Sequence, residues 1–290
     1  MEEVFNLENS SLYNLWREQK LANYKQAVDN IIKIKDPSRL SQNEKLKILR
    51  NCRAANFAIY VSEKKIDMDG FRGLLKQLNL FNPETSIFSG AEGITEISNI
   101  GHGRQGEYIP YSNKPLSWHT DGYYNTRGSE ICAFILHCNT RAKSGGVSSL
   151  LDHEIAYIKL RDKNPEFIKV MMEPDAFEVP ANVENGRVLR PANVGPVFSL
   201  VNGNLHMRFS GRKRFVNWKN KPALLEARIF LEEILDDKYG LVTHHTLQPG
   251  EGVICNNVLH RRSAFFDGDS DPRRLFRARF SSRVTHTIET

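Results

Sequence analysis

In the first third of the chain, apolar residues recur at helical spacing over a polar background, which predicts amphipathic helices there. The residues that set this spacing are Leu12, Leu15, Trp16, Tyr24, Val28, Ile31 and Ile32. A second helix is expected to begin at Ser41, because Ser41 and Glu44 have the spacing of a capping box. A strand over 56–62 and a short helix over 69–78 follow. We expect the N-terminal helices, over about residues 10–55, to pack outside the core of the fold.

From about residue 94 onward, short apolar runs typical of β-strands replace the helical spacing. Asn202-Gly203 lies between two alternating runs and predicts a tight hairpin turn. These runs cover residues 94–100, 131–138, 147–151, 197–201, 205–209, 241–247, 252–259 and 274–284. The second part of the chain is therefore predicted to be mostly β.

Helices interrupt the β-rich part twice. A pair is predicted over 152–172, with Asn164-Pro165 as cap and first turn, and another helix over 222–239, ending at Gly240. Because regular helices separate few of the strands, the pattern favours a sandwich or barrel with helices outside over a parallel βαβ sheet. The sequence has no internal repeat and no convincing linker, so we predict one domain over residues 1–290.

Composition excludes some classes of protein. No apolar run approaches the ~20 residues of a membrane span, and the acidic, polar N-terminus is unlike a signal peptide. The net charge of +6 is spread along the chain without a basic stripe, which argues against nucleic-acid binding. The four cysteines are scattered and are interpreted as reduced and buried, as in a cytoplasmic protein.

A possible metal motif lies at His119-Thr120-Asp121, where residues i and i+2 of a strand face the same side. Two histidines and a carboxylate form the facial triad of non-haem iron(II) oxygenases. A single His-x-Asp in a chain of this length is also expected by chance, so a polar strand end explains it equally well. A third candidate ligand, His260, strengthens the metal interpretation. It ends a strand that follows the Pro249-Gly250 turn.

Alternation near the C-terminus singles out an arginine. Arg274 shares one strand face with Phe276, Ala278 and Phe280, so it is expected to point inward with them. A buried guanidinium is costly unless it meets an anion, and a carboxylate bound at two points is the usual partner. Arg274 is therefore predicted to bind a ligand carboxylate, with a structural salt bridge as the alternative.

Four segments, WHTDG, SGGVSSLLD, LQPGEGVICNNVLH and HRRSAF…RRLFRARF, resemble the taurine dioxygenase (TauD/TfdA) family of 2-oxoglutarate-dependent oxygenases, in the same order. The resemblance covers about residues 90–285 and leaves the N-terminal helices outside. It implies a double-stranded β-helix, or jelly roll, with Fe(II) held by His119, Asp121 and His260. Arg274 matches the arginine that binds the distal carboxylate of 2-oxoglutarate. Ser148 matches a hydroxyl near that co-substrate, or is a plain strand serine.

The resemblance also implies the reaction, in which 2-oxoglutarate and O₂ yield succinate and CO₂ while a substrate C–H bond is oxidised. Halogenating relatives lack a coordinating residue at the position of Asp121, so its carboxylate implies hydroxylation, or cleavage that follows it. In sulfonate-oxidising members a second arginine lies four residues past the co-substrate arginine, where this chain has Ala278. Pro115 likewise replaces an asparagine of those members. Taurine is therefore disfavoured, and the basic balance of the chain favours another small, polar, anionic substrate.

Several side chains are candidates for substrate contact, with packed core or rim residues as the alternative. They are Tyr123, Tyr124, Asn125, His102, Arg104, Tyr108 and Arg208. Arg262 is expected to make a structural ion pair beside the metal. His244-His245 is a weaker metal candidate, because adjacent strand residues face opposite sides.

Two other functions remain open from the sequence. One is a non-catalytic jelly-roll binding protein, against which the complete set of ligands argues. The other is an oxygenase that acts on a macromolecule or on an envelope sugar acid such as Kdo.

Overall fold

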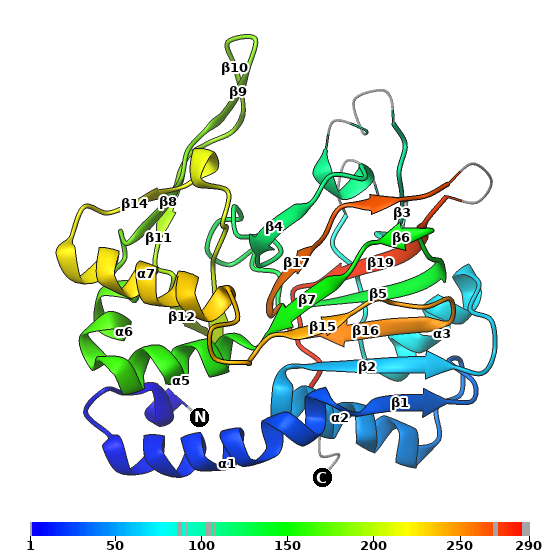
Figure 1. The fold of residues 1–290 in the computed structure, drawn as a ribbon, viewed down its shortest axis with the longest axis horizontal. Coiled ribbons are helices and arrows are strands. Elements are labelled where there is room, and N and C mark those ends of the chain that lie inside the picture. The colour runs from blue at the N-terminus through cyan, green and yellow to red at the C-terminus, as the bar shows by residue number, and fades with distance from the viewer. Residues whose placement is uncertain are drawn as a thin grey trace.

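The computed structural model describes residues 2–85, 89–90, 92–101, 106, 108–268 and 272–285. Among these residues, the largest sheet has six strands (Figure 1). In sheet order they are β1 (Ile31–Ile34), β2 (Phe57–Ser62), β16 (Glu251–Cys255), β5 (Ala133–Thr140), β19 (Arg274–Phe280) and β3 (Thr95–Ser98). All neighbours are antiparallel except β1 and β2, which run parallel.

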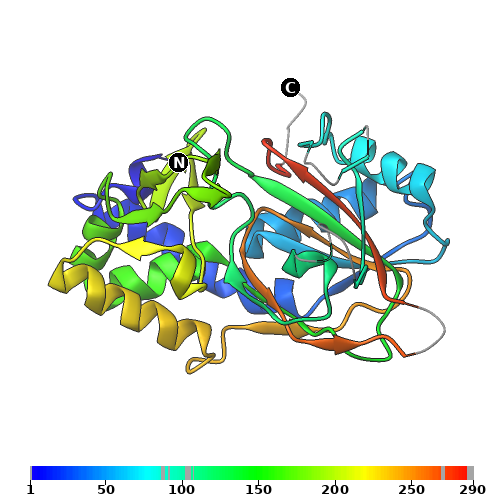
Figure 2. The same ribbon diagram turned by 90° about the horizontal axis from the view of Figure 1, so that it is seen from above.

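A second, four-stranded sheet faces the first (Figures 1 and 2). Its order is β15 (Thr243–His245), β7 (Ser148–Leu151), β17 (Leu259–Arg262) and β4 (Leu116–His119), all antiparallel. One pocket takes lining residues from both sheets, such as Leu136 of β5 and Leu150 of β7. The candidate site therefore lies between the two sheets of an open sandwich, and neither sheet closes on itself.

Helices cover the outer face of the large sheet. They are α2 (Gln42–Ala55) and α3 (Met68–Gln77), and α1 (Ser10–Val28) packs against α2. The outward side chains Phe276, Ala278 and Phe280 of β19 belong to one apolar cluster with residues of these helices. The apolar face of β19 is thus buried against helices, whereas its other face turns toward the space between the sheets.

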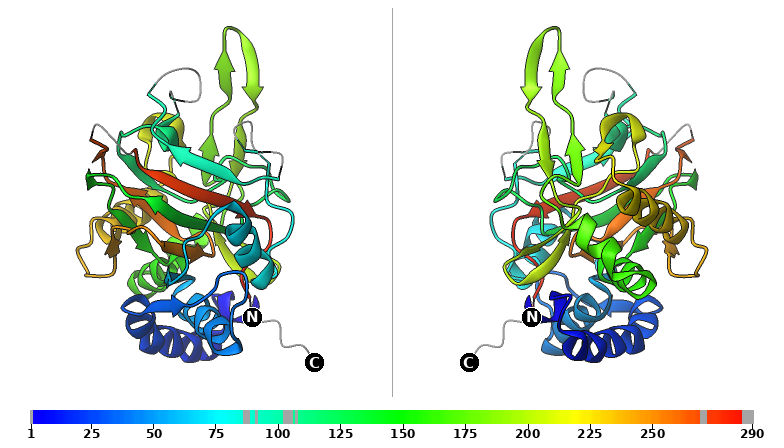
Figure 3. Two further views of the ribbon diagram at one scale, coloured as in Figure 1. Left: turned by 90° about the vertical axis from the view of Figure 1, so that its right-hand side faces the viewer. Right: turned by 90° about the vertical axis from the view of Figure 1, so that its left-hand side faces the viewer.

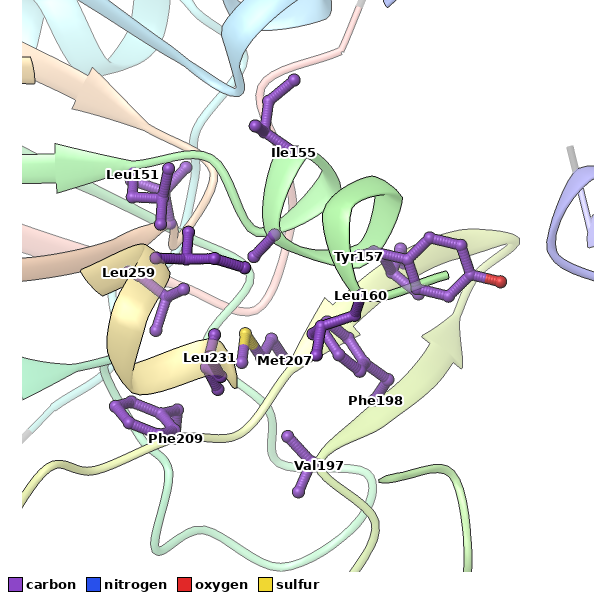
Figure 4. Packing of buried hydrophobic residues seen from close by; sticks show 14 of the residues in the cluster. Leu151, Ile155, Tyr157, Leu160, Val197, Phe198, Met207, Phe209, Leu231 and Leu259 are labelled. Atoms are coloured by element: carbon purple, nitrogen blue, oxygen red, sulfur yellow. The ribbon is translucent and has the colours of Figure 1, made fainter. Parts of the chain in front are cut away.

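A helical layer with short strands occupies the other end of the molecule (Figure 1). The helices are α5 (His153–Lys163), α6 (Pro165–Met171) and α7 (Pro222–Leu235). Figure 4 shows the side chains of Leu160, Met207 and Leu231, which belong to the apolar core of this layer. The short strands are β8 (Phe177–Val179), β9 (Asn182–Glu184), β10 (Arg187–Arg190), β11 (Asn193–Gly195), β12 (Phe198–Val201), β13 (Asn204–Met207) and β14 (Asn217–Trp218). A two-stranded sheet of β6 (Ser144–Gly145) and β18 (Phe265–Phe266) borders the main sheets.

Most predicted elements are present. The capping box at Ser41 is formed, Asn164 caps α6, and Asn202-Gly203 forms the turn between β12 and β13 with positive φ angles at both residues. Short 3-10 helices at Glu2–Phe5, Ile109–Tyr111 and Lys213–Phe215 complete the described elements.

Two predictions need correction, and one hairpin was not predicted. Ile31 and Ile32 lie in strand β1 rather than in the first helix, which ends at Val28. The helix from Pro222 ends at Leu235, well before Gly240. A second Asn-Gly turn, Asn185-Gly186, closes the β9–β10 hairpin, which projects from the body (Figure 3). In the part of the chain described here, no helix has the length and apolar character needed to cross a membrane.

A buried lysine of α1 forms ion pairs with two carboxylates at the start of α5. Lys20 is 5% exposed, and its Nζ lies 2.6 Å from Asp152 Oδ2 and 2.5 Å from Glu154 Oε2. Burial by itself lowers the pKa of Lys20, but the two carboxylates outweigh it and raise the pKa above its usual value. Lys20 is therefore the cation that forms ion pairs with both buried carboxylates.

Lys20→Met is expected to lower the free energy of unfolding by about 3–5 kcal/mol, because it leaves two buried carboxylates uncompensated. Urea unfolding followed by circular dichroism measures this loss. Lys25→Met is the matched control on the same helix, because its side chain is 89% exposed and exposed pairs contribute little. Equal stabilities of the two variants would contradict the assigned role of Lys20.

Candidate active site

The structure brings the three predicted ligands together at the facing ends of two paired strands. His119 ends β4, Asp121 follows two residues later, and His260 lies in β17. His260 pairs directly with His119 across the two strands, and their rings lie 4.1 Å apart between centroids. One donor atom from each of the three residues lies within 4.8 Å of the other two. Residues separated by about 140 positions in the chain thus form one compact donor set.

Backbone carbonyls fix the orientation of both imidazole rings. Nδ1 of His119 lies 2.9 Å from the Ser117 oxygen, and Nδ1 of His260 lies 2.9 Å from the Val258 oxygen. Because Nδ1 donates its proton to a carbonyl, the unprotonated Nε2 is left to bind a metal. Burial lowers the pKa of His119 to about 3 and also lowers that of His260. Both rings are therefore neutral at neutral pH, as metal ligation requires.

The third ligand is held as a carboxylate. Burial alone would raise the pKa of Asp121, but the charges of Arg277 and Arg279 outweigh it and hold the pKa well below its usual range. Oδ1 of Asp121 lies 3.7 Å from Nε2 of His119, too far for a hydrogen bond and close enough to share an ion. Two neutral imidazoles and one carboxylate on one side of a space fit Fe(II) with open coordination positions.

A pocket that is partly open to solvent lies against these ligands. Apolar side chains such as Phe134 and Leu150 form much of its wall. Its lining includes four arginines, Arg261, Arg262, Arg273 and Arg277, and one acid, Asp121. Since a divalent cation would neutralise Asp121, the pocket has a large excess of positive charge and suits anionic ligands.

The predicted position of Arg274 is wrong. It shares a strand face with Phe276, Ala278 and Phe280 as expected, but that face packs against the outer helices, and Arg274 itself is exposed. The preceding residue, Arg273, is 7% exposed and lines the pocket together with Leu275 and Arg277. The sequence predicts the apolar face of β19 to line the pocket because buried apolar residues usually face a core. Here the sheet is buried on both faces, and the polar face is the one that lines the site.

Arg273 has the surroundings of an anion-binding residue. Its guanidinium carbon lies 5.1 Å from the centre of the Phe265 ring. Among the described residues no carboxylate forms an ion pair with it, although the charge of Asp267, whose carboxylate accepts from the Arg273 backbone N–H, partly offsets its burial. Burial lowers the pKa of Arg273. A buried cation without a partner is unfavourable, so a ligand anion would stabilise it. Ser148 of β7 lines the same pocket as Arg273.

Arg277 lines the same pocket as the three metal ligands. It is the charge that most strongly lowers the pKa of Asp121, and it also acts on His119 and His260. Its Nε is buried without a hydrogen-bond partner in the described part of the chain. Because Arg273 rather than Arg274 lines the pocket, the position four residues further on is Arg277 rather than Ala278, and the lack of a second arginine no longer disfavours taurine.

The loop after Asp121 is held by the neighbouring layer and does not line the pocket. Arg208, 8% exposed, donates from Nε to the Tyr123 oxygen at 3.1 Å. The amide of Asn193 donates to the carbonyls of Tyr124 and Asn125. The predicted substrate contacts of Tyr123, Tyr124, Asn125 and Arg208 therefore find no support from the pocket lining, and the alternative of packed residues fits them better.

The remaining candidates have other surroundings. His102 and Arg104 lie outside the described residues, and Tyr108 is exposed. Arg262 donates from NH2 to the carbonyls of Ser112 and Lys114 rather than forming the expected ion pair. His244 and His245 are bonded to Ser149 and Glu251, respectively, away from the three metal ligands.

Comparison with known proteins gives the family. The sequence model described as "Taurine catabolism dioxygenase TauD, TfdA family" matches residues 19–279. The chain belongs to this family. The resemblance is thus confirmed, and the expectation that the N-terminal helices lie outside it is wrong, since the match includes most of α1 and all of α2.

Curated relatives of the chain include two uridine-5'-phosphate dioxygenases, from Amycolatopsis sp and Streptomyces sp. Each is 29% identical, over 172 residues (57% of this chain) and 176 residues (58%). The chain spans about 60% of the length of these TauD-like relatives, 60% of one and 62% of the other.

Solved structures confirm the predicted jelly-roll fold. The non-heme iron oxygenase OrfP, in complex with Fe and alpha-ketoglutaric acid, has a TM-score of 0.62 and 15% identity, and the match covers 84% of this chain and 81% of OrfP. An asparagine oxygenase in complex with Fe(II), 2S,3S-3-hydroxyasparagine and succinate has a TM-score of 0.57 and 12% identity, covering 91% and 90%. At such identities the likeness establishes the fold.

Proposed function

We propose that this TauD-family chain is an Fe(II)- and 2-oxoglutarate-dependent dioxygenase that hydroxylates a small anionic substrate. The observation that supports the proposal is one pocket that contains both a facial His-Asp-His donor set and a buried arginine, Arg273, which forms no ion pair with any residue that the structure describes. In the overall reaction, substrate R–H, 2-oxoglutarate and O₂ give R–OH, succinate and CO₂. One oxygen atom enters the product and the other enters succinate.

Each residue has a defined part in this proposal. His119 and His260 would hold iron through Nε2, and Asp121 through its carboxylate. Arg273 would bind the distal carboxylate of 2-oxoglutarate at two points, and Ser148 would add a hydroxyl hydrogen bond. When bound, the metal and co-substrate supply the oxidising chemistry, while the protein orients the reactants. The apolar wall, including Phe134 and Leu150, keeps water from the reacting centre.

We further propose that Arg277 binds the anionic group of the substrate. The proposal is supported by the buried Nε of Arg277, which has no hydrogen-bond partner among the described residues, and by the positive charge that Arg277 exerts on all three metal ligands. The relatives named uridine-5'-phosphate dioxygenases make a phosphate monoester of a nucleoside the first class to test. A cytoplasmic location is also part of the proposal, since all four cysteines are free and buried.

Arg277→Leu is expected to raise the KM for the anionic substrate by about 10–100-fold, because a hydrogen bond to a charged group contributes about 1.5–3 kcal/mol. The measurement is substrate-dependent succinate formation over a panel of small phosphates and carboxylates, beginning with uridine 5'-phosphate. The KM for 2-oxoglutarate should change much less. An equal rise in both KM values would contradict the assignment of Arg277 to the substrate.

A further inference from the structure

Asn257 lies at the turn between β16 and β17, three residues before His260. It is 3% exposed and adopts a left-handed backbone conformation with φ of 53°. Asparagine tolerates this conformation better than most residues do. The turn therefore sends the Asn257 side chain inward at little backbone cost, toward the segment that contains Asp121.

The amide of Asn257 makes three hydrogen bonds to backbone atoms. Its Oδ1 accepts from the Asp121 N–H at 2.7 Å. Its Nδ2 donates to the Asp121 carbonyl at 2.9 Å and to the Ile131 carbonyl at 2.6 Å. The side chain thus pairs with both backbone groups of Asp121, as a neighbouring strand would.

This contact matters because Asp121 lies beyond the end of β4 and has no partner in the strand ladder. Gly122 follows it with φ of +67°, and a Cβ at Gly122 would come within 2.6 Å of the Ile131 side chain. The chain therefore reverses tightly just after the ligand. A buried amide that holds the peptide of Asp121 fixes where its carboxylate can point.

The same turn orients a second ligand. The Val258 carbonyl, adjacent to Asn257, accepts from Nδ1 of His260 at 2.9 Å. One short segment thus sets both Asp121 and His260, through the side chain of Asn257 and the backbone of Val258. We propose that Asn257 is a positioning residue that fixes the distance between these two ligands and so determines metal affinity. This inference rests on the proposed function of the site.

The neighbouring residue provides a matched control. Asn256 is also 3% exposed, and its amide also pairs with both backbone groups of one residue, accepting from the Val284 N–H at 2.9 Å and donating to the Val284 carbonyl at 3.2 Å. Val284 holds no ligand. Substituting Asn256 therefore removes a similar buried pair of hydrogen bonds without changing contacts to the metal ligands.

The test titrates cobalt(II) into the purified, metal-free full chain and measures affinity by calorimetry and by the absorption spectrum of the bound ion. We expect Asn257→Gly, which keeps the left-handed backbone accessible, to weaken cobalt(II) binding by about 10–100-fold, the usual effect of losing a residue that orients a ligand. The spectrum of the bound ion should change as well. Asn256→Ala should bind cobalt(II) as the wild type does, although both variants lower the melting temperature.

A second variant keeps the test decisive if Asn257→Gly does not fold. Asn257→Asp retains the acceptor for the Asp121 N–H, loses both donors and adds a negative charge that by itself attracts cations. Weaker cobalt(II) binding by this variant would support a geometric role. Affinity equal to or tighter than wild type in a folded Asn257→Gly variant, or an unchanged spectrum of the bound cobalt(II) in a folded Asn257→Asp variant, would overturn the inference alone. A wild-type chain that bound no cobalt(II) would overturn the proposed function together with it.

Discussion

His119→Ala is expected to abolish 2-oxoglutarate turnover, lowering succinate formation at least 1,000-fold or to the level of a reaction without enzyme. The substitution removes one of the three metal ligands, so iron binding is weakened and the facial donor set is incomplete. Succinate is measured with purified protein, Fe(II), ascorbate and 2-oxoglutarate, across the substrate panel. The expected loss is the largest of any single substitution in the chain.

His244→Ala is the matched control for this result. His244 also lies on the four-stranded sheet, but its side chain is 45% exposed and bonds to Ser149 away from the pocket. It should retain most of the wild-type succinate formation. Equal activities of His119→Ala and the wild type would contradict the metal site at His119. Inactivity of both the wild type and His244→Ala across the whole panel would contradict the oxygenase activity.

The second large effect concerns two adjacent arginines. Arg273→Gln is expected to raise the KM for 2-oxoglutarate about 100-fold or more, because two charge-assisted hydrogen bonds contribute about 1.5–3 kcal/mol each. Arg274→Gln should leave this KM within about twofold, since its side chain lies in solvent on the other face of β19. Initial rates of succinate formation over a range of 2-oxoglutarate concentrations measure both values.

The stability of Arg273→Gln separates ligand binding from a structural role. Because the guanidinium of Arg273 is buried without an acidic partner among the described residues, its removal should not lower the melting temperature of the ligand-free protein. A strong destabilisation would instead identify Arg273 as part of the fold. A large rise in the KM for 2-oxoglutarate in Arg274→Gln, with the KM of Arg273→Gln unchanged, would show that Arg274, the residue predicted from the sequence, binds the co-substrate.

The sequence predicted the elements that follow local rules. The capping box at Ser41, the Asn164-Pro165 helix start and the Asn202-Gly203 turn depend on neighbouring residues alone, and all three are formed. His119 ends a strand, but Asp121 lies beyond the end of β4, and His260 lies in β17 rather than at the end of the strand that follows Pro249-Gly250. The convergence of the three residues could not be predicted from local pattern, because it depends on the pairing of β4 with β17, which brings distant segments together.

The error at Arg274 has a specific physical origin. Alternation along β19 shows which residues share a face, but not which of two buried faces contains the site. The large sheet is covered on one side by α2 and α3 and on the other by the smaller sheet, so apolar side chains did not mark the pocket. Arg273 and Arg277 could have been found by asking which face of β19 contained charges without local partners.

The roles of Asn257 and the β9–β10 hairpin escaped the sequence for different reasons. Asn257 acts through backbone atoms of Asp121 and Ile131, and backbone contacts leave no pattern in the chain. The hairpin turn at Asn185-Gly186 was visible, but the strands beside it are short and exposed on both faces, so they lack the alternation that identifies a strand.

A crystal structure grown without oxygen, in the presence of Fe(II) and 2-oxoglutarate, tests the central claim most directly. We predict an anomalous-scattering peak at the iron edge in contact with His119 Nε2, the Asp121 carboxylate and His260 Nε2. The distal carboxylate of 2-oxoglutarate should lie against the guanidinium of Arg273. Iron bound elsewhere, or a co-substrate carboxylate that met Arg274 or no arginine of this pocket, would contradict the account.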